Sequence, residues 1–367
     1  MNGLKRLTNK EPDFENLRTV LLNGTPEYLP IYELFADREI MEVVLGKPFP
    51  DLTRGVFRTE REVTPEERRR YQDLTFEFYY KSGFDYIPAG PGLPLKRESH
   101  MTTGPAREIS GLKRAWQNER DGFIQTWRDF DEFQWPTSSD ISFSGIEYAA
   151  ANLPEGMKII SGVSGIYENV SFIPGVETLC YMIYDEPELV AAMFEKIGSL
   201  FAEMFCALAE IDAVGAVILA DDLGHFGGTF LPPDFLREHM MPWYRKISDA
   251  AKGNNKPFIL HCCGNVKEIM SELIDCGIDA KHSFEDKIEP VWEAKGCYGD
   301  QIALLGGIDV NILSTYTEED TRRHVRSVLD RCAGKGYALG SGNSVTDYMK
   351  VENFLAMIDE ARIFNGV

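Results

Sequence analysis

Short apolar segments alternate with helical segments along most of this 367-residue chain, and this alternation limits the folds open to it. Strands that alternate with helices pair in parallel through right-handed crossovers. The predicted strands are 28–35, 84–90, 158–164, 216–222, 257–263, 279–285, 301–308 and 337–342. Eight such units close into a (β/α)8 TIM barrel. An open doubly wound sheet is the rival, weakened because no G-x-G-x-x-G motif follows an early strand.

The remaining segments fill the places that a barrel leaves for helices. A helix over 13–24 precedes the first strand as an N-terminal extension, and residues 97–137 contain glycines and alternating segments that predict a β-hairpin insertion. The other predicted helices are 65–82, 143–153, 186–211, 233–253, 265–276, 288–296, 317–334 and 350–364. No linker-like composition shift or internal repeat divides the sequence. We therefore expect residues 1–367 to form a single barrel domain.

Charge and cysteine usage exclude several classes of function. The net charge of −20 argues against nucleic acid as a partner and against docking on anionic membranes. The longest apolar runs, such as AVILA at 216–220, are too short to span a bilayer, and the N-terminus lacks the apolar core of a signal peptide. The seven cysteines show no framework spacing. These observations favour a reduced, cytoplasmic protein.

The segment 256–264, KPFILHCCG, ends a buried strand with side chains that can bind a metal. Alternate residues of a strand share a face, so His261 and Cys263 project together while Cys262 points the other way. An imidazole beside a thiolate is half of a zinc site. Alone, Cys263 reads equally well as a packed core residue and His261 as a satisfied core histidine. The pair, followed by Gly264, favours a metal or catalytic role.

Polar residues also follow the other predicted strands, at the end of the barrel where the chemistry of this fold takes place. They are Glu33, Ser164, Tyr167, Glu168, Asp221, Asp222, His225, His282, Glu285, Asp309, Ser341 and Asn343. Neighbouring aspartates face opposite sides, so one of the pair at 221 and 222 is available to cap the next helix. The segments GGID and GSG either cradle a phosphate or form tight turns with positive φ, and turns are favoured.

Several longer segments resemble the uroporphyrinogen decarboxylase superfamily, in particular its corrinoid-dependent methyltransferase branch. PFILHCCGNV is similar to the H-x-C-G zinc strand of that branch, and LLGGIDVNIL to the G-N-x-D-P segment near the seventh strand. ADDLGHFGGTFLPPDFLREHMMPW resembles the segment with an aspartate and a Gly-rich loop, and YDEPELV the helix start after the third strand. The resemblance spans most of the chain and implies the same barrel.

Two departures separate the chain from the decarboxylases themselves. Their R-Q-A-G-R-Y stretch, whose arginines bind the substrate carboxylates, is replaced by LPIYELFADRE, which places Glu33 there. Their G-H-G near the eighth strand is replaced by Gly340-Ser341-Gly342. The third zinc ligand of the methyltransferases, a cysteine in G-C-G, is likewise replaced by Ser341. A neutral hydroxyl is a much poorer zinc ligand than a thiolate, so the resemblance implies a weakened or remodelled metal site.

The resemblance implies an enzyme that moves a methyl group between a corrinoid protein and a small acceptor. A thiol acceptor uses zinc to form the thiolate, whereas tetrahydrofolate needs a hydrogen-bonding pocket and a proton source. The expected metal ligands are His261, Cys263 and Glu285. The expected acid–base residues are Asp221, Asp222, His225 and Glu168, and the expected substrate-binding residues are Glu33, Asp309, Ser341 and Asn343. The chain is also compatible with a homodimer.

Two other functions remain open at this stage. One is uroporphyrinogen decarboxylase itself, a carboxy-lyase of porphyrin biosynthesis. The other is a barrel that binds a small molecule without turning it over. Carbon dioxide release from the porphyrinogen distinguishes the first, and tight binding without product distinguishes the second.

Overall fold

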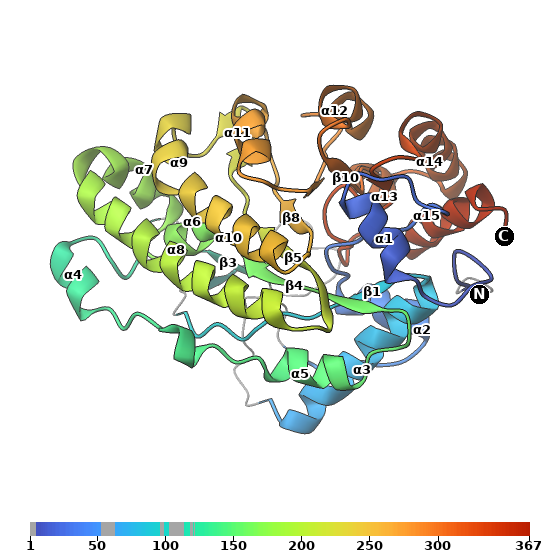
Figure 1. Cartoon of the computed structure of the whole chain (residues 1–367), viewed down its shortest axis with the longest axis horizontal. Helices are drawn as coiled ribbons and strands as arrows, with labels where there is room; N and C mark the ends of the chain where they lie inside the picture. Colours follow the sequence, from blue (N-terminus) through green and yellow to red (C-terminus); the bar gives the residue numbers. More distant parts are fainter. Residues whose placement is uncertain (1–4, 53–62, 96–98, 103–113, 118–119, 121) are drawn as a thin grey trace.

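Seven parallel strands form the central sheet of the protein, and helices cover its outer face (Figure 1). The computed structural model describes residues 5–52, 63–95, 99–102, 114–117, 120 and 122–367. The strands, in both chain and sheet order, are β1 (Tyr86–Pro88), β4 (Lys158–Ser164), β5 (Val214–Ala220), β8 (Phe258–His261), β9 (Ala280–His282), β10 (Ala303–Leu305) and β11 (Tyr337–Ala338). This uninterrupted order, with each strand beside its successor, is that of a TIM barrel and confirms the predicted class.

The segment 28–35, predicted as the first of the eight strands, does not form a full strand of the sheet. Its backbone pairs with the β11 end of the sheet only through bridges at Ile31 and Ala36. Pro30 has no N–H to donate to a ladder, which limits the pairing on that side. On the other side the segment contacts β1 through a side chain: the Tyr86 hydroxyl accepts the Glu33 N–H at 2.8 Å and donates to the Glu33 carbonyl. The Tyr86 side chain, rather than a ladder of backbone hydrogen bonds, therefore joins the 28–35 segment to β1.

Fifteen α-helices flank the sheet in the part of the chain that the structure describes. They are α1 (Phe14–Leu21), α2 (Arg38–Leu45), α3 (Pro65–Ser82), α4 (Trp127–Glu132), α5 (Ser144–Ala151), α6 (Ile166–Ser171), α7 (Val176–Asp185), α8 (Pro187–Glu210), α9 (Pro233–His239), α10 (Met241–Gly253), α11 (Met270–Asp275), α12 (Val291–Tyr298), α13 (Val310–Thr315), α14 (Glu318–Cys332) and α15 (Val351–Phe364). The helix predicted over 65–82 has those bounds, since a Thr64 capping box starts it and Gly83, at φ +96°, ends it.

Several helical features differ from the expectation, among them the short helices α4 and α13, which were not predicted. The helix predicted over 233–253 is divided into α9 and α10 at Met240, because Pro242 cannot continue the hydrogen-bond ladder of the preceding helix. Two further helices, α6 and α7, lie between β4 and α8, where no helix was predicted. The helix α2 was also missed. It follows Asp37 and is too short to show a clear apolar period.

The longest helix, α8, shows how the outer layer packs on the sheet. It packs against β4, β5 and α10, with the apolar side chains of its inner side buried. Figure 1 shows the helix running along the sheet. Gly198 in the middle of α8 lies against the ring of Trp243 from α10, and a Cβ at this glycine would come within 2.4 Å of the ring. The small residue therefore lets the two helices approach closely.

The predicted hairpin insertion is confirmed in its paired part. Strands β2 (Ser99–Thr102) and β3 (Arg114–Gln117) are antiparallel, with Ser99 opposite Gln117. The turn between them lies outside the described residues. The rest of the predicted 97–137 insertion includes α4. None of the helices described combines the length and the apolar character that crossing a bilayer requires.

Candidate metal centre at the carboxyl ends of three strands

Three neighbouring strands bring the candidate site together. In the sheet, Ala220 of β5 pairs with His261 of β8, and His261 pairs with His282 of β9, so these strands end at the same level. Asp222 lies two residues beyond β5 and Cys263 two residues beyond His261. The Cys263 N–H donates to Asp222 Oδ1 at 2.9 Å, which ties the two loops together. The site therefore lies at the strand ends, as the fold predicts.

Three ligand atoms converge at this point. His261 Nε2 lies 3.4 Å from Cys263 Sγ and 3.6 Å from Asp222 Oδ1. All three atoms lie within 4.8 Å of one another. The predicted orientation of His261 and Cys263 toward one side is thus confirmed by their contact. The carboxylate that joins them is that of Asp222, a residue expected to act in acid–base chemistry.

These atoms fit the dimensions of a zinc site. Zinc–nitrogen, zinc–oxygen and zinc–sulfur bonds near 2.0–2.3 Å place tetrahedral ligand atoms about 3.3–3.6 Å apart. The separations of 3.4 and 3.6 Å from His261 Nε2 fall at this spacing. Imidazole, thiolate and carboxylate are all common zinc ligands, and a three-ligand set leaves a fourth position for a substrate.

Charge and burial also suit a cation. Burial, and then the charge of Asp222, hold the pKa of the Cys263 thiol well above its usual value. Burial, and then Lys281, lower the pKa of His261 to about 3, so its imidazole is neutral and keeps a lone pair. A divalent cation would offset both effects by stabilising the thiolate and binding that lone pair.

A second set of contacts surrounds the cysteine. The Ser283 hydroxyl and the Asn343 amide donate to Cys263 Sγ, at 3.4 and 3.1 Å. Ser283 has φ +80°, a conformation that residues with a Cβ rarely adopt. Such strain is often found at functional sites. Asn343 was expected at the site, whereas Ser283 was not, because its φ angle has no signature in the sequence.

The two residues before Ser283 extend to opposite faces of β9. His282 Nδ1 lies 2.7 Å from His261 Nδ1, whereas the Lys281 ammonium donates to the carbonyls of Cys262 and Ser283, at 3.2 and 2.6 Å. Burial lowers the pKa of Lys281. Sequence reasoning placed His282 at this strand end without a role and missed Lys281. A lysine inside a short buried strand was the available signal.

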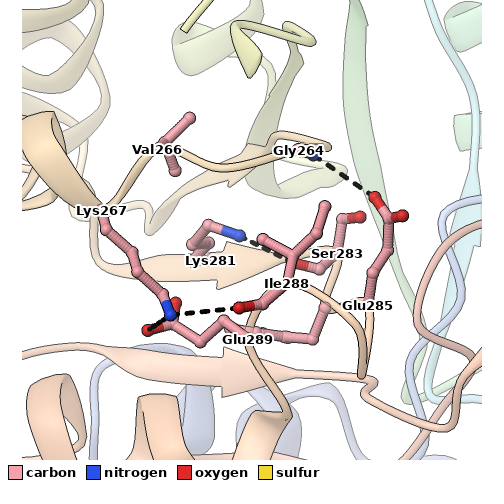
Figure 2. Close-up of a pocket in the computed structure, with 9 residues that line it drawn as sticks. Gly264, Val266, Lys267, Lys281, Ser283, Glu285, Ile288 and Glu289 are labelled. Atoms are coloured by element: carbon pink, nitrogen blue, oxygen red, sulfur yellow. Dashed lines mark hydrogen bonds and ion pairs between the residues drawn. The ribbon is translucent and has the colours of Figure 1, made fainter. Parts of the chain in front are cut away.

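Lys281 also lines a small pocket beside the cluster (Figure 2). Gly264, which follows Cys263 in the chain, and Ser283, which donates to Cys263 Sγ, also line it. Glu285, an expected metal ligand, accepts the Gly264 N–H at 3.4 Å, and Lys267 donates to the Ile288 carbonyl at 3.0 Å. These bonds connect the loop after β8 to the loop after β9. Glu285 is not one of the three residues whose ligand atoms converge. It accepts instead the N–H of Gly264, the residue that follows Cys263.

The other predicted acid–base residues lie at separate places. Asp221 is fully buried and accepts the N–H groups of Tyr167 and Glu168, at 3.0 and 2.9 Å, and the Tyr244 hydroxyl at 2.8 Å. It therefore caps the N-terminus of α6 from a neighbouring strand, and burial raises its pKa to about 6. Glu168 is half-buried in the first turn of α6. His225 is exposed on the hairpin of β6 (Gly224–His225) and β7 (Gly228–Thr229).

The predicted substrate-binding residues other than Asn343 use their polar atoms in hydrogen bonds with other residues of the chain. Asp309 caps α13 by accepting the Asn311 N–H at 2.7 Å, and it also accepts the Asp286 N–H at 2.9 Å. Glu33 accepts the Ser341 N–H at 2.8 Å and contacts the Ser341 hydroxyl. Both Glu33 and Ser341 are buried, and burial raises the pKa of Glu33 to about 8. Gly306 and Gly307, at φ +82° and +103°, form the predicted turn.

Comparison with known proteins identifies the family of this chain. The family model for uroporphyrinogen decarboxylase (URO-D) matches residues 121–364. The chain belongs to the URO-D family. Among curated proteins, the chain is similar to a methylcobamide:CoM methyltransferase, MtaA, from Methanosarcina barkeri. The two are 31% identical over 100 residues, which cover 27% of this chain and 26% of that protein. The chain is 26% identical over 184 residues to a uroporphyrinogen decarboxylase from Geotalea uraniireducens, covering 50% and 51% of the two chains.

A solved structure extends the similarity to the whole fold. A methyltransferase from Methanosarcina mazei superposes with a TM-score of 0.72 at 16% identity, covering 97% of this chain and 99% of the other. The sequence matches to the curated relatives, in contrast, span about half of their length or less. The fold of that methyltransferase therefore extends over nearly the whole chain, whereas the URO-D family match covers residues 121–364.

Proposed function

We propose that this URO-D family member is a methyltransferase that moves a methyl group between a corrinoid protein and a small acceptor. The observation that carries the proposal is the convergence of His261 Nε2, Cys263 Sγ and Asp222 Oδ1 at the carboxyl ends of β5 and β8. The similarity to proteins named as methylcobamide:CoM and methylated-thiol–coenzyme M methyltransferases supports the same reaction class.

His261, Cys263 and Asp222 would hold a zinc ion, with Asp222 taking the place that a third cysteine has in the resembling enzymes. Zinc bound there would supply Lewis-acid stabilisation of a thiolate at neutral pH. The protein's own contribution is to position the donors. The Asn343 amide and the Ser283 hydroxyl donate to the cysteine sulfur, which stabilises its negative charge. The Cys263 N–H orients the Asp222 carboxylate.

This donor set favours a small thiol as the acceptor, with tetrahydrofolate as the alternative. A thiol needs help to lose its proton, and a zinc ion held by these three residues would supply that help. The acceptor and the corrinoid would meet at the Asp222 side chain, which is 39% accessible, whereas the His261 side chain is 5% accessible. Glu285, Glu168 and His225 remain predicted contributors to the reaction.

The remaining parts of the proposal concern the whole chain. We propose that residues 1–367 form one domain that acts in the cytoplasm, where its seven unpaired cysteines, including Cys263, stay reduced. Its partners would be a corrinoid protein and a small acceptor. A homodimer is compatible with this arrangement.

The test is a methyl-transfer assay with zinc-loaded protein and methylcobalamin as the donor. Coenzyme M, 2-mercaptoethanol and tetrahydrofolate are offered in separate reactions, and demethylation is followed by the cobalamin absorbance. We expect transfer to a thiol and bound zinc by elemental analysis. Transfer to tetrahydrofolate alone would replace the thiol acceptor. No transfer to any acceptor, together with carbon dioxide release from uroporphyrinogen, would assign the decarboxylase reaction instead. Ligand binding with no product would indicate a non-catalytic barrel.

A further inference from the structure

A line of three polar contacts runs from the backbone beside β11 to the candidate metal centre. The Ser341 carbonyl lies 3.2 Å from His282 Nε2, and His282 Nδ1 lies 2.7 Å from His261 Nδ1. The other nitrogen of His261, Nε2, is the atom that faces Cys263 Sγ and Asp222 Oδ1. Two imidazoles in series thus connect a backbone carbonyl to the metal ligands.

The carbonyl determines where each proton lies along this line. A carbonyl oxygen only accepts, so the hydrogen of its contact belongs to His282 Nε2. A neutral imidazole carries one N–H, which leaves a lone pair on His282 Nδ1. His261 Nδ1 must then be the donor in the contact between the rings. Its own single proton is used there, and His261 Nε2 presents a lone pair to the candidate metal centre.

Both rings meet the condition of neutrality that this deduction needs. Both are buried, with exposed fractions of 4% for His261 and 0% for His282. Removal from water disfavours a charged imidazolium, and the 2.7 Å contact between the two Nδ1 atoms leaves room for only one hydrogen, so the two rings cannot both be charged. The nearby charged groups are Lys281 and Asp222, and the Lys281 ammonium donates to backbone carbonyls on the opposite face of β9.

The packing around His282 holds its ring in this orientation. The ring makes an edge contact with Tyr32, with centroids 5.0 Å apart. Gly306, at φ +82°, borders the contact with the carbonyl: a Cβ there would lie 2.2 Å from the Ser341 oxygen and 3.0 Å from His282 Nε2. The absence of a side chain at Gly306 therefore leaves room for the hydrogen bond that begins the line.

We propose that His282 is a positioning residue that fixes His261 in the Nδ1–H tautomer and so directs the Nε2 lone pair of His261 to the metal centre, with the Ser341 carbonyl as the anchor. Metal-bound histidines commonly donate their second N–H to an acceptor that fixes the ring. Here the acceptor is another histidine. The use of this tautomer in catalysis rests on the proposed function, but the tautomer is a property of the protein alone.

The first experiment reads the tautomers directly, in the metal-free full-length protein at neutral pH. Long-range ¹H–¹⁵N spectra distinguish protonated from unprotonated ring nitrogens, and the chain has only six histidines to assign. We expect His261 to carry its proton on Nδ1 and His282 on Nε2. The reverse pattern in either ring, or a charged ring in either residue, would overturn the proposal.

The second experiment measures zinc affinity by competition with a chromophoric chelator. His282→Leu removes both ring nitrogens and should weaken zinc binding by about 10–100-fold, the usual effect of losing such a partner. His282→Gln offers an amide oxygen to His261 and an N–H to the Ser341 carbonyl, so it should recover most of that loss. His239→Leu, a histidine on α9, is the matched control and should bind zinc as the unchanged protein does.

Folding is checked by circular dichroism for each variant, and His282→Gln keeps the test decisive if the leucine variant is unfolded. Zinc affinity of a folded His282→Leu equal to that of the control, or a His282→Gln no better than His282→Leu, would contradict the proposal. These measurements do not use methyl transfer. Loss of the proposed activity with the predicted tautomers intact would refute the function alone, and altered tautomers in an active enzyme would refute this inference alone.

Discussion

The two sides of the barrel mouth hold similar polar residues but use them differently. On the side of β5, β8 and β9, Asp222, His261 and Cys263 direct three ligand atoms to one point. On the side of β10, β11 and the 28–35 segment, the Glu33 carboxylate and the Ser341 hydroxyl contact each other, and Asp309 caps α13. A polar residue at a strand end is therefore a candidate ligand only where its ligand atom lies close to those of other such residues, as the three on the first side do.

The adjacent aspartates after β5 show the same contrast within two residues. Asp221 has no exposed surface and accepts three hydrogen bonds, whereas Asp222 remains partly exposed beside His261. Variants of Asp222, His261 and Cys263 should therefore affect metal binding and activity, and variants of Asp221 or of the second side should affect stability.

Substitution of the cysteine ligand should have the largest effect. Cys263→Ser replaces a thiolate with a poor zinc ligand, so zinc affinity and methyl transfer should fall by more than about 100-fold, beyond the loss typical of an outer partner. Chelator competition and the methylcobalamin assay measure the two quantities. Cys262→Ser is the matched control, because its side chain is buried and is not among the converging ligand atoms. Equal zinc affinity in the two variants would remove Cys263 from the ligand set.

The neighbouring aspartates should separate metal binding from stability. Asp222→Asn should lower zinc affinity by about 10–100-fold with little change in the unfolding free energy. Asp221→Asn places an amide N–H against backbone donors at α6, which should cost about 1–3 kcal/mol of stability while zinc affinity is retained. Urea titration and chelator competition on both variants test the pair. If Asp221→Asn lost zinc affinity and Asp222→Asn lost stability, Asp221 rather than Asp222 would be the ligand.

The buried acid on the second side should give stability a distinct pH dependence. Burial raises the pKa of Glu33 to about 8 in the folded chain, from an ordinary value of 4.5. Between these values the folded chain binds a proton that the unfolded chain has lost, so stability should fall as pH rises, by up to about 1.4 kcal/mol per unit. Glu33→Gln imitates the neutral acid and should flatten that slope in urea titrations from pH 5 to 8.

The control for this experiment is Glu188→Gln, a change at an exposed position in the first turn of α8. It should leave the slope as it is in the unchanged protein. A Glu33→Gln variant that keeps the full slope would show that the carboxyl group is ionised in the folded barrel.

The strained serine should give the smallest effect. Ser283→Gly relieves a backbone at φ +80° and should stabilise the protein by about 1 kcal/mol, whereas Ser283→Ala keeps the strain and removes only the hydroxyl that donates to Cys263. Thermal unfolding compares the two variants. A glycine variant less stable than the alanine variant would indicate that the conformation carries no strain.

Much of the barrel could be predicted because alternation and helix signals are local. The strand order follows from the sequence of βα units, and His261 and Cys263 could be paired because strand geometry places alternate residues together. The choice between Asp221 and Asp222 could not be made in the same way. It depends on the backbone donors of α6, a helix that was itself not predicted.

Other features depend on distant parts of the chain. The 28–35 segment was predicted as a full strand from its apolar residues. Its pairing is set by Pro30 and by Tyr86, and Tyr86 is separated from the segment by α2 and α3. The tautomer of His261 depends on a carbonyl beside β11. Neither the φ angle of Ser283 nor these contacts has a local pattern that reading the sequence would find.

The closure between β1 and the 28–35 segment has a consequence for motion. Because the Tyr86 hydroxyl, rather than a ladder of backbone bonds, joins Glu33 to β1, this seam should be the first part of the barrel wall to open. Amide hydrogen exchange at Glu33 should be faster than at Ile218 in the middle of β5, and Tyr86→Phe should accelerate it further. The wall beside Glu33 would then behave as a hinge between the N-terminal segment and an otherwise continuous sheet.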